Sequence, residues 1–290
     1  MNEKMLWLWL SKIDISNKIK MELINKFKSV DKIWKANIDD FIYYKFTDKI
    51  IDKIMNLDYR KGLESEFRYL ENNNIKIISF LDDEYPQKLL QISDFPICLY
   101  VRGNIGILNN KSIGIVGSRN ASDYGKIISR DISKKLADRG CNIISGLARG
   151  IDKYAHLGAL ESKNGKTIAV VGTGVDDESV YPLENKRIYE RILEKGGTII
   201  SEYPIKTKPI SYNFPARNRI ISGLSDKILV VEANEKSGSL ITVDFALEQG
   251  KEVFAVPGNI YSKNSKGTNK LISEGANIFI DVDYLLWWSN

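Results

Sequence analysis

The first part of the chain has apolar residues at helical spacing and no alternation typical of strands. Apolar side chains recur every three or four positions, at Leu6, Leu10, Ile13, Ile19, Leu23, Ile24, Phe27, Ile50, Ile51 and Ile54. This spacing places apolar side chains on one face of a helix. Three consecutive asparagines at 72–74 mark a boundary. We therefore expect a small all-helical domain over residues 1–70 and a second domain over residues 71–290.

In the second domain the pattern changes to short apolar runs that alternate with amphipathic segments. A first strand begins at residue 75, and later runs predict strands at 112–116, 141–145, 167–171, 198–201, 227–231 and 252–256. The segments between these runs predict helices at 122–138, 152–162, 184–194, about 213–223 and 240–249. Strict alternation with continuous apolar strands specifies an α/β fold, in which helices cover both faces of a mostly parallel sheet.

Turns rich in glycine and serine follow several predicted strands. They are Gly117-Ser118-Arg119, Ser145-Gly146-Leu147-Ala148-Arg149-Gly150, Gly172-Thr173-Gly174 and, after Glu232, Ser237-Gly238-Ser239. Ligands of parallel sheets bind at the carboxyl ends of the strands, where glycine lets the backbone approach a phosphate and helix N-termini favour anions. A single such turn is also common for packing reasons. Several turns at one sheet edge favour a phosphate site.

One long segment, residues 203–225, contains no acidic residue. Its charges are Lys206, Lys208, Arg217 and Arg219, and the aromatic residues Tyr203, Tyr212 and Phe214 lie among them. Cations neutralise phosphates, and aromatic faces stack on unpaired bases. The segment therefore predicts binding of single-stranded DNA.

Composition changes this picture little. The 290 residues include 43% hydrophobic residues, enough for an ordinary core, and the formal net charge is +5. A general bias toward lysine explains that charge as well as a polyanionic partner does. Cys98 and Cys141 lie in separate apolar runs, as reduced core thiols do. The apolar run 5–10 is too short to span a membrane, so we expect a cytoplasmic protein without membrane association.

The common fingerprints of nucleotide and metal binding do not fit this chain. Gly172 and Gly174 begin a dinucleotide motif, but Asp177 stands in place of the third glycine. The run Gly165-Lys166-Thr167 ends like a phosphate-binding loop, yet Leu160 replaces the required glycine. A single histidine and no cysteine cluster argue against zinc. We expect no cofactor and no metal.

The candidate catalytic groups have structural explanations that we favour. Asp152 and His156 are four residues apart on a predicted helix and can lie on one face. Such a pair is more often structural than a general acid and base. Four carboxylates near strand ends could assist a hydrolysis, although bonding to loop amides is their more common use. They are Asp176, Asp177, Glu202 and Glu232.

Several ordered motifs resemble the DNA-processing protein A family, also called DprA or Smf. The similarity extends from about residue 76 to residue 283. The motifs are Gly117-Ser118-Arg119, residues 145–152 with Ala155-His156, residues 172–176 with Tyr181-Pro182 and Asn185, residues 201–204, residues 214–225, residues 231–233 with 237–240, and residues 253–258 with Gly267, Asn269 and Gly275-Ala276.

This resemblance implies an extended Rossmann-like domain that binds single-stranded DNA, protects incoming strands and delivers them to the RecA recombinase in natural transformation. It also implies a homodimer formed through that domain, and no cofactor. Residues 1–70 are similar to the helical, sterile-alpha-motif-like domain of many members. Many members continue into a C-terminal winged helix, which we do not expect here because the chain stops at Asn290.

The residue pattern and the resemblance together define the expected DNA site. We expect Arg119 to anchor a phosphate, with a salt bridge to Asp123 as the alternative, and Phe214 to stack on a base, with a core position as the alternative. No catalytic residue is expected. The expected DNA-binding residues are Gly117, Ser118, Arg119, Gly146, Arg149, Gly174, Lys206, Lys208, Phe214, Arg217, Asn218, Arg219, Ser237, Gly238 and Ser239.

Two other functions stay open. The resemblance extends to nucleotide-binding sensors and phosphoribohydrolases of the same Rossmann-like superfamily. The glycine-rich strand ends together with Glu232 could hold a nucleotide. Those hydrolases have a Pro-Gly-Gly-x-Gly-Thr signature, whereas residues 235–240 lack that string of glycines. The third possibility is an adaptor whose main task is to dock RecA.

Overall fold

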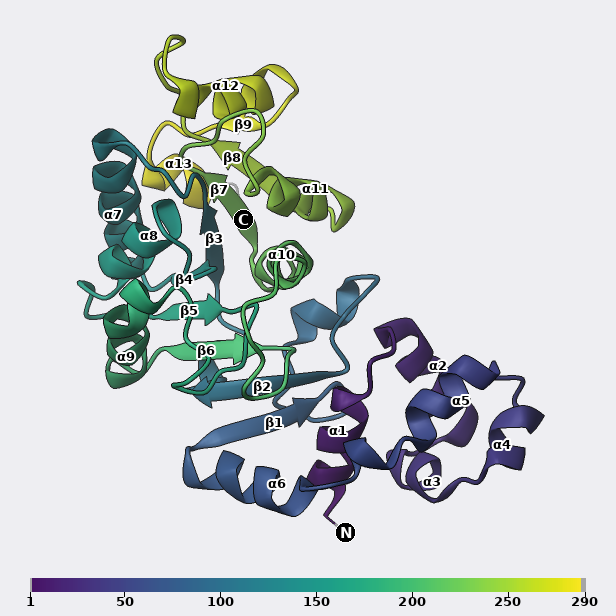
Figure 1. Cartoon of the computed structure of the whole chain (residues 1–290). Helices are drawn as coiled ribbons and strands as arrows, with labels where there is room; N and C mark the ends of the chain where they lie inside the picture. Colours follow the sequence, from purple (N-terminus) through teal and green to yellow (C-terminus); the bar gives the residue numbers. More distant parts are fainter. Residues whose placement is uncertain (1, 288–290) are drawn as a thin grey trace.

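The computed structural model describes residues 2–287 and contains one nine-stranded sheet, ordered β1-β2-β6-β5-β4-β3-β7-β8-β9 (Figure 1). Strand β2 is antiparallel to β1 and β6, and every other neighbouring pair is parallel. The predicted mostly parallel sheet is therefore confirmed. The strands are β1 (Ile75–Ser79), β2 (Cys98–Gly103), β3 (Ser112–Val116), β4 (Asn142–Ser145), β5 (Thr167–Val170), β6 (Thr198–Ser201), β7 (Lys227–Val230), β8 (Glu252–Ala255) and β9 (Asn277–Ile278).

Helices cover both faces of the sheet, as the alternating pattern predicted. In Figure 1, α7, α8 and α9 lie on one face, and α10 and α11 lie on the other. Each face buries its own apolar cluster against the strands. The helices of this part are α7 (Asp123–Asp138), α8 (Ile151–Ala159), α9 (Lys186–Glu194), α10 (Asn213–Leu224), α11 (Leu240–Glu248), α12 (Lys266–Ser273) and α13 (Val282–Trp287).

The strand order creates a crevice at one point of the sheet edge. From β3 the chain moves outward through β4, β5 and β6, and it then returns to add β7, β8 and β9 on the other side of β3. Val116 at the end of β3 pairs with Val230 at the end of β7, so the turns that follow these strands start level with each other. A crevice where connections diverge in this way is the usual ligand position in open α/β sheets.

Residues 2–72 form the predicted helical segment. Ser16, Ser29 and Asn37 each accept a hydrogen bond from a backbone N–H of the helix that they precede, which explains where α2, α3 and α4 begin. The helices are α1 (Glu3–Lys12), α2 (Asn17–Phe27), α3 (Val30–Lys35), α4 (Ile38–Tyr43), α5 (Asp48–Met55) and α6 (Leu63–Asn72).

The helical segment shares its apolar core with the sheet. All five residues from Leu6 to Leu10 are buried, so α1 is covered on every side. The rings of Trp7 and Phe80 meet edge to face at 5.9 Å, and Ser11 Oγ lies 2.7 Å from Tyr100 Oη on β2. One cluster of buried side chains continues from α1 to β1, β2 and β6. The boundary at residue 70 stays a prediction.

Both cysteines are free and buried, as the sequence predicted for reduced core thiols. Burial raises the pKa of each thiol above its ordinary value. Across residues 2–287, no helix has the length and apolar character needed to cross a bilayer.

Asp152 and His156 bind the backbone of the turn that precedes α8. The Asp152 carboxylate accepts hydrogen bonds from Gly146 N at 3.1 Å and Ala148 N at 3.4 Å. His156 Nε2 accepts from Leu147 N at 3.3 Å, and Nδ1 lies 2.7 Å from Thr167 Oγ1. Burial, helped by the positive charge of Arg217, lowers the pKa of His156 to about 3. These contacts agree with the structural role that we favoured.

We predict that the single histidine remains neutral in the folded protein throughout pH 8 to 5. Its pKa is about 6.5 in the unfolded chain and about 3 in the folded protein. The unfolded state therefore binds the proton first, and the free energy of unfolding decreases as pH falls below about 6.5, by up to about 1.4 kcal/mol per pH unit from this group. NMR titration of the His156 ring protons checks this. An inflection near pH 6.5 with the fold intact would contradict it.

We also predict that the helical segment and the sheet unfold together. Leu8→Ala should lower the free energy of unfolding by about 2–5 kcal/mol, because Leu8 is fully buried. Urea unfolding followed by tryptophan fluorescence and by circular dichroism should give one coincident transition. Ile42→Ala is the control, since Ile42 lies in the same segment but is 55% exposed. Two separate transitions, with Leu8→Ala affecting one alone, would show independent domains.

Candidate nucleic-acid interface

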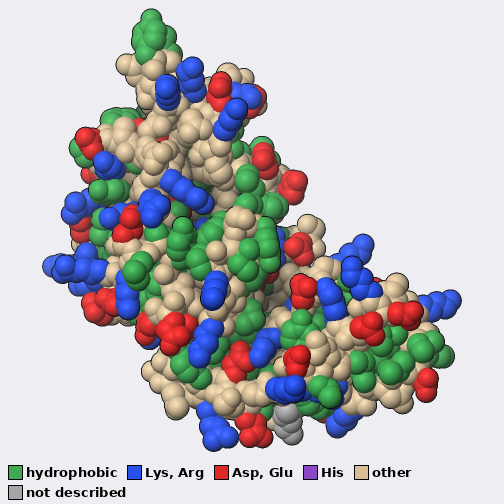
Figure 2. Space-filling view, viewed as in Figure 1, with side chains coloured by type: hydrophobic (Ala, Val, Ile, Leu, Met, Phe, Trp, Pro, Cys, Tyr) green, Lys and Arg blue, Asp and Glu red, His purple; other side chains and the backbone are tan. Residues whose placement is uncertain are grey.

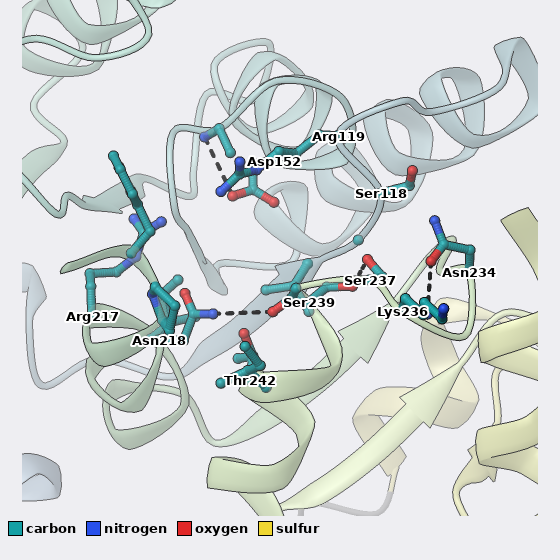
Figure 3. A pocket seen from close by; sticks show the side chains of 18 of the residues that line it. Ser118, Arg119, Asp152, Arg217, Asn218, Asn234, Lys236, Ser237, Ser239 and Thr242 are labelled. Atoms are coloured by element: carbon teal, nitrogen blue, oxygen red, sulfur yellow. Dashed lines mark hydrogen bonds between the residues drawn. The ribbon is translucent and has the colours of Figure 1, made fainter. Parts of the chain in front are cut away.

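A cleft of about 320 Å³ lies at the carboxyl ends of β3 and β7 (Figure 3). The turn after β3, the first half of α10 and the loop between β7 and α11 form its walls. We call it the strand-end cleft. Its charged lining residues are Arg119, Arg217 and Lys236, against one acid, Asp152. The cleft therefore coincides with the crevice that the strand order creates, and its lining carries net positive charge.

The turn after β3 is fixed by close contact with the end of β7. Ser118 N donates a hydrogen bond to the carbonyl of Glu232 at 2.7 Å. A Cβ atom on Gly117 would lie 2.7 Å from that carbonyl oxygen, so only glycine fits. Arg119 follows directly and is exposed. The glycine and serine of this turn thus set the position from which Arg119 enters the cleft.

The Arg119 side chain lies beside an aromatic ring. Its guanidinium carbon is 5.9 Å from the centroid of Phe214, close enough for a cation–π contact. Asp123, the alternative partner, instead pairs with Lys126 at 2.8 Å. Within the described part of the chain, no carboxylate forms an ion pair with Arg119, which leaves the charge available for a phosphate.

Phe214 is half-buried at the edge of the cleft. Its exposure is therefore intermediate between that of a base-stacking residue and that of a core residue, the two alternatives from the sequence. Its ring packs on Tyr181 with centroids 5.5 Å apart and an interplanar angle of 41°. Gly172 backs the ring, since a Cβ atom there would lie 3.1 Å from it. Tyr181 is 42% exposed and was not among the predicted site residues. The available signal was an aromatic residue directly before Pro182 in the loop that follows β5.

The loop between β7 and α11 supplies the opposite wall. The hydroxyl oxygens of Ser237 and Ser239 lie 2.8 Å apart, and Gly238 faces open space. Asn218 Nδ2 donates to the Gly238 carbonyl at 3.4 Å. The exposed Lys236 also lines the cleft, although we did not predict it. A cation directly before the Ser-Gly-Ser turn would have been the signal.

Arg217 lies at the floor of the cleft. Its guanidinium binds the protein's own backbone and is not free to bind a ligand in the same way as Arg119. Nη1 donates to the Gly146 carbonyl at 2.7 Å and also to the Val170 carbonyl. Burial lowers the pKa of Arg217 to about 10, against the opposing charge of Asp152. Gly146 has no room for a Cβ atom, which would lie 2.5 Å from the guanidinium. Both predicted site residues therefore support the cleft.

Arg219 lies on the other side of α10 from the cleft. It is buried and pairs with Glu202 at 2.6 Å and with Asp94 at 3.1 Å. Burial alone would lower the pKa of Arg219, but these carboxylates raise it above its ordinary value. Arg219 is thus held by carboxylates of the protein, and its contact with DNA stays a prediction.

Four other predicted residues lie outside the strand-end cleft. Gly174 packs against Asp176 and the backbone of residues 204 and 206. Lys206 extends over the ring of Tyr69 in α6, with Nζ 5.5 Å from the centroid, and Lys208 is exposed on the same loop. Arg149 borders Phe214 in a smaller adjoining pocket and pairs with Glu184 at 3.1 Å. The acid-free segment is therefore not one continuous cationic surface.

The four carboxylates near the strand ends are all bonded within the protein. Glu232 accepts from Ser122 N at 2.9 Å, and Asp176 accepts from Lys206 N at 2.8 Å. Asp177 pairs with Arg102 at 2.6 Å, and Glu202 holds Arg219. These contacts match the structural use that we favoured. In residues 2–287, no group of three or more His, Cys, Asp or Glu side chains is arranged to hold a metal ion.

Known proteins similar to this chain share one family. Residues 76–287 match the family model described as DNA recombination-mediator protein A. Protein Smf of Escherichia coli (strain K12) is 45% identical over 78% of this chain and 60% of that protein. Protein Smf of Synechocystis is 37% identical over 98% of this chain and 72% of that protein. The chain thus spans less than two thirds of the Escherichia coli relative.

Two solved structures extend the comparison to the fold. The X-ray structure of DprA from Streptococcus pneumoniae superposes with a TM-score of 0.85 and 34% identity, over 99% of this chain and 98% of that one. DprA from Helicobacter pylori, a structure concerned with its single-stranded DNA binding mode, gives a TM-score of 0.66 and 29% identity over 73% of this chain and 94% of that one. Because the family model covers most of its length and the similarity extends to both sequence and fold, the chain belongs to the DNA recombination-mediator protein A family.

Proposed function

We propose that this protein binds single-stranded DNA in the strand-end cleft. The observation that carries the proposal is the pairing of Arg119 with Phe214 at the cleft edge, where a charge without an ion-pair partner lies 5.9 Å from an aromatic ring. A phosphate can bind the guanidinium in a bidentate manner while the neighbouring base stacks on the ring. The Helicobacter pylori relative, whose structure concerns a single-stranded DNA binding mode, supports the same substrate class.

The geometry favours an unpaired strand over a duplex. Stacking on Phe214 and Tyr181 requires a base whose face is free, which a duplex does not offer. The cleft holds about 320 Å³, within the range of pockets that enclose one small ligand. Lys236 on the opposite wall can bind a second phosphate. The strand would therefore cross the cleft with one phosphate bound to Arg119 and another bound to Lys236.

The protein acts by binding and not by catalysis in this proposal. A nucleotide hydrolase would need a carboxylate free to activate water, and the four carboxylates near the strand ends are all bonded to amides, hydroxyls or cations. Incubation with nucleoside monophosphates tests this point. Release of the base, or tight nucleotide binding without DNA, would favour the hydrolase or sensor instead.

Membership of the family supports the wider role. We propose that the bound strand is protected and passed to RecA in recombination and natural transformation, in the cytoplasm, by a homodimer. Light scattering of the purified chain tests the dimer. RecA assembly on single-stranded DNA, with and without the protein, tests the transfer. DNA binding measured without RecA distinguishes this function from that of a pure adaptor.

A titration of single-stranded against duplex DNA over a range of salt concentrations tests the central proposal. The single strand should bind more tightly at each salt concentration, and its affinity should decrease with salt as phosphate contacts are lost. Equal or tighter binding of the duplex would refute the cleft as a single-strand site.

We predict that Arg119→Ala weakens binding of all sequences alike. Loss of one phosphate contact should reduce the slope of log affinity against log salt by about 0.7, the value for a single strand. Arg119→Lys should recover part of the affinity, because it keeps the charge without the bidentate geometry. Arg139→Ala is the control, since Arg139 lies beyond the far end of α7 and pairs with Asp283. An unchanged salt slope in Arg119→Ala would exclude the anchor role.

We predict that Phe214→Ala weakens single-strand binding by about 1–3 kcal/mol, the usual worth of one stacked base. Phe279→Ala is the matched control, because Phe279 is also half-buried but packs against the apolar cluster on the α7 face of the sheet, away from the cleft. Both variants should lose similar thermal stability, whereas only Phe214→Ala should lose DNA affinity. If Phe214→Ala lowers the melting temperature and leaves affinity at the parent value, the ring has only a packing role.

A further inference from the structure

A second cavity lies on the opposite side of the first turn of α10. It has a volume of about 360 Å³, and we call it the helical groove because residues 11–20 of the helical segment form one wall. The other wall comes from the sheet domain, from Asp94, Pro96, Ile97 and Cys98 and from nine residues between Glu202 and Arg219. Tyr212, Asn213 and Ala216 of α10 and its N-cap face this groove, whereas Phe214, Arg217 and Asn218 face the strand-end cleft. One helical turn thus separates the two cavities.

The helical groove has almost no uncompensated charge. Asp14 pairs with Lys53 at 2.8 Å, and the carboxylates Asp94 and Glu202 both bind Arg219. Lys12, a further lining residue, pairs with Glu66. Figure 2 shows acidic and basic side chains side by side where the helical segment joins the body. A cavity with balanced charge does not concentrate phosphates. A ligand that binds there must therefore be held by hydrogen bonds, stacking or apolar contacts.

Lys20 is the remaining charged residue of the groove lining. It is buried, and its Nζ donates to the Ser11 carbonyl at 2.9 Å. Burial lowers the pKa of the Lys20 amine to about 8. An ammonium has three N–H donors, and in residues 2–287 the Ser11 carbonyl is the one hydrogen-bond acceptor that Lys20 Nζ reaches. A ligand oxygen or nitrogen can accept from the others.

The rim of the groove has an exposed aromatic side chain. Tyr212 is 69% exposed, and Ile210 beside it is 38% exposed. The half-buried Tyr203 also lines the groove, as do Thr207 and Ile210 of the loop that carries the exposed Lys208. An exposed aromatic ring next to a cavity with balanced charge suits a planar base, while the exposed lysine of the adjoining loop suits a phosphate.

We propose that a single strand bound in the strand-end cleft continues over the first turn of α10 and places a base in the helical groove. Tyr212 stacks on this base at the rim, and Lys208 binds a phosphate beside it. The inference rests on the proposed function, because it extends the same DNA ligand beyond the cleft. It makes the helical segment part of the DNA site, since residues 11–20 form the far wall of the second subsite.

Oligothymidylates of increasing length test the proposal by fluorescence anisotropy with the full chain. Short strands that fill only the cleft should bind the parent and Tyr212→Ala equally. Longer strands should bind the parent more tightly, and Tyr212→Ala should remove that gain, a loss of about five-fold or more for one stacked base. Ile210→Glu adds a negative charge at the rim and should remove the same gain. Tyr43→Ala is the control, because Tyr43 is 77% exposed on α4.

The possible outcomes separate the two proposals. If the parent binds no strand of any length, the proposed function itself is wrong. If the parent binds short strands but Tyr212→Ala and Ile210→Glu match it at every length, the groove lies outside the strand path and this inference is overturned. Equal losses for short and long strands would assign Tyr212 to the cleft and overturn it as well. A loss confined to the longer strands, with Tyr43→Ala unchanged, supports it.

Discussion

The buried guanidinium of Arg217 is the contact on which the geometry of the site depends. It joins α10 to the ends of β4 and β5 through the carbonyls of Gly146 and Val170. Removing a guanidinium from water is costly, and charge-assisted hydrogen bonds together with the nearby Asp152 offset that cost. Because Gly146 has no side chain, α10 can approach closely enough for this contact. The position of Phe214, one turn earlier, follows from it.

A second buried arginine fixes the opposite side of α10. Arg219 binds Glu202, which follows β6, and Asp94, which precedes β2. Asn17 of the helical segment donates to the same Glu202 carboxylate at 3.5 Å. The middle of α10 is therefore held from both sides. A helix fixed in this way presents Phe214 to the cleft, and its N-cap residue Tyr212 to the groove. Because the helix is already ordered, binding a strand costs little further conformational entropy.

The sequence predicted the parallel sheet and the strand-end cleft because both depend on local patterns. The turn directly after β3 and the Ser-Gly-Ser turn in the loop after β7 were therefore expected at one sheet edge, and Ser118 and Ser237 both line the cleft. It did not predict which cations are free. Arg219 is 17 residues from Glu202 and 125 from Asp94, so no local pattern reveals that pairing. Likewise, Lys206 meets Tyr69 only through the fold.

The composition of residues 203–225, without acidic residues, indicated a segment whose cations face DNA. In the structure, the arginines of this segment instead bind partners within the protein. Its two arginines are bound by carboxylates or backbone carbonyls outside the segment and serve to hold α10, while the exposed Arg119 and Lys236 of the cleft come from elsewhere in the chain. The apolar run Met5–Leu10 shows the same limit. Its continuous apolar character was visible, but only the fold shows that it packs between α6 and β1 and so makes the helical segment part of one core. A strand that contacts both the sheet domain and the helical segment therefore meets two parts of one packed core.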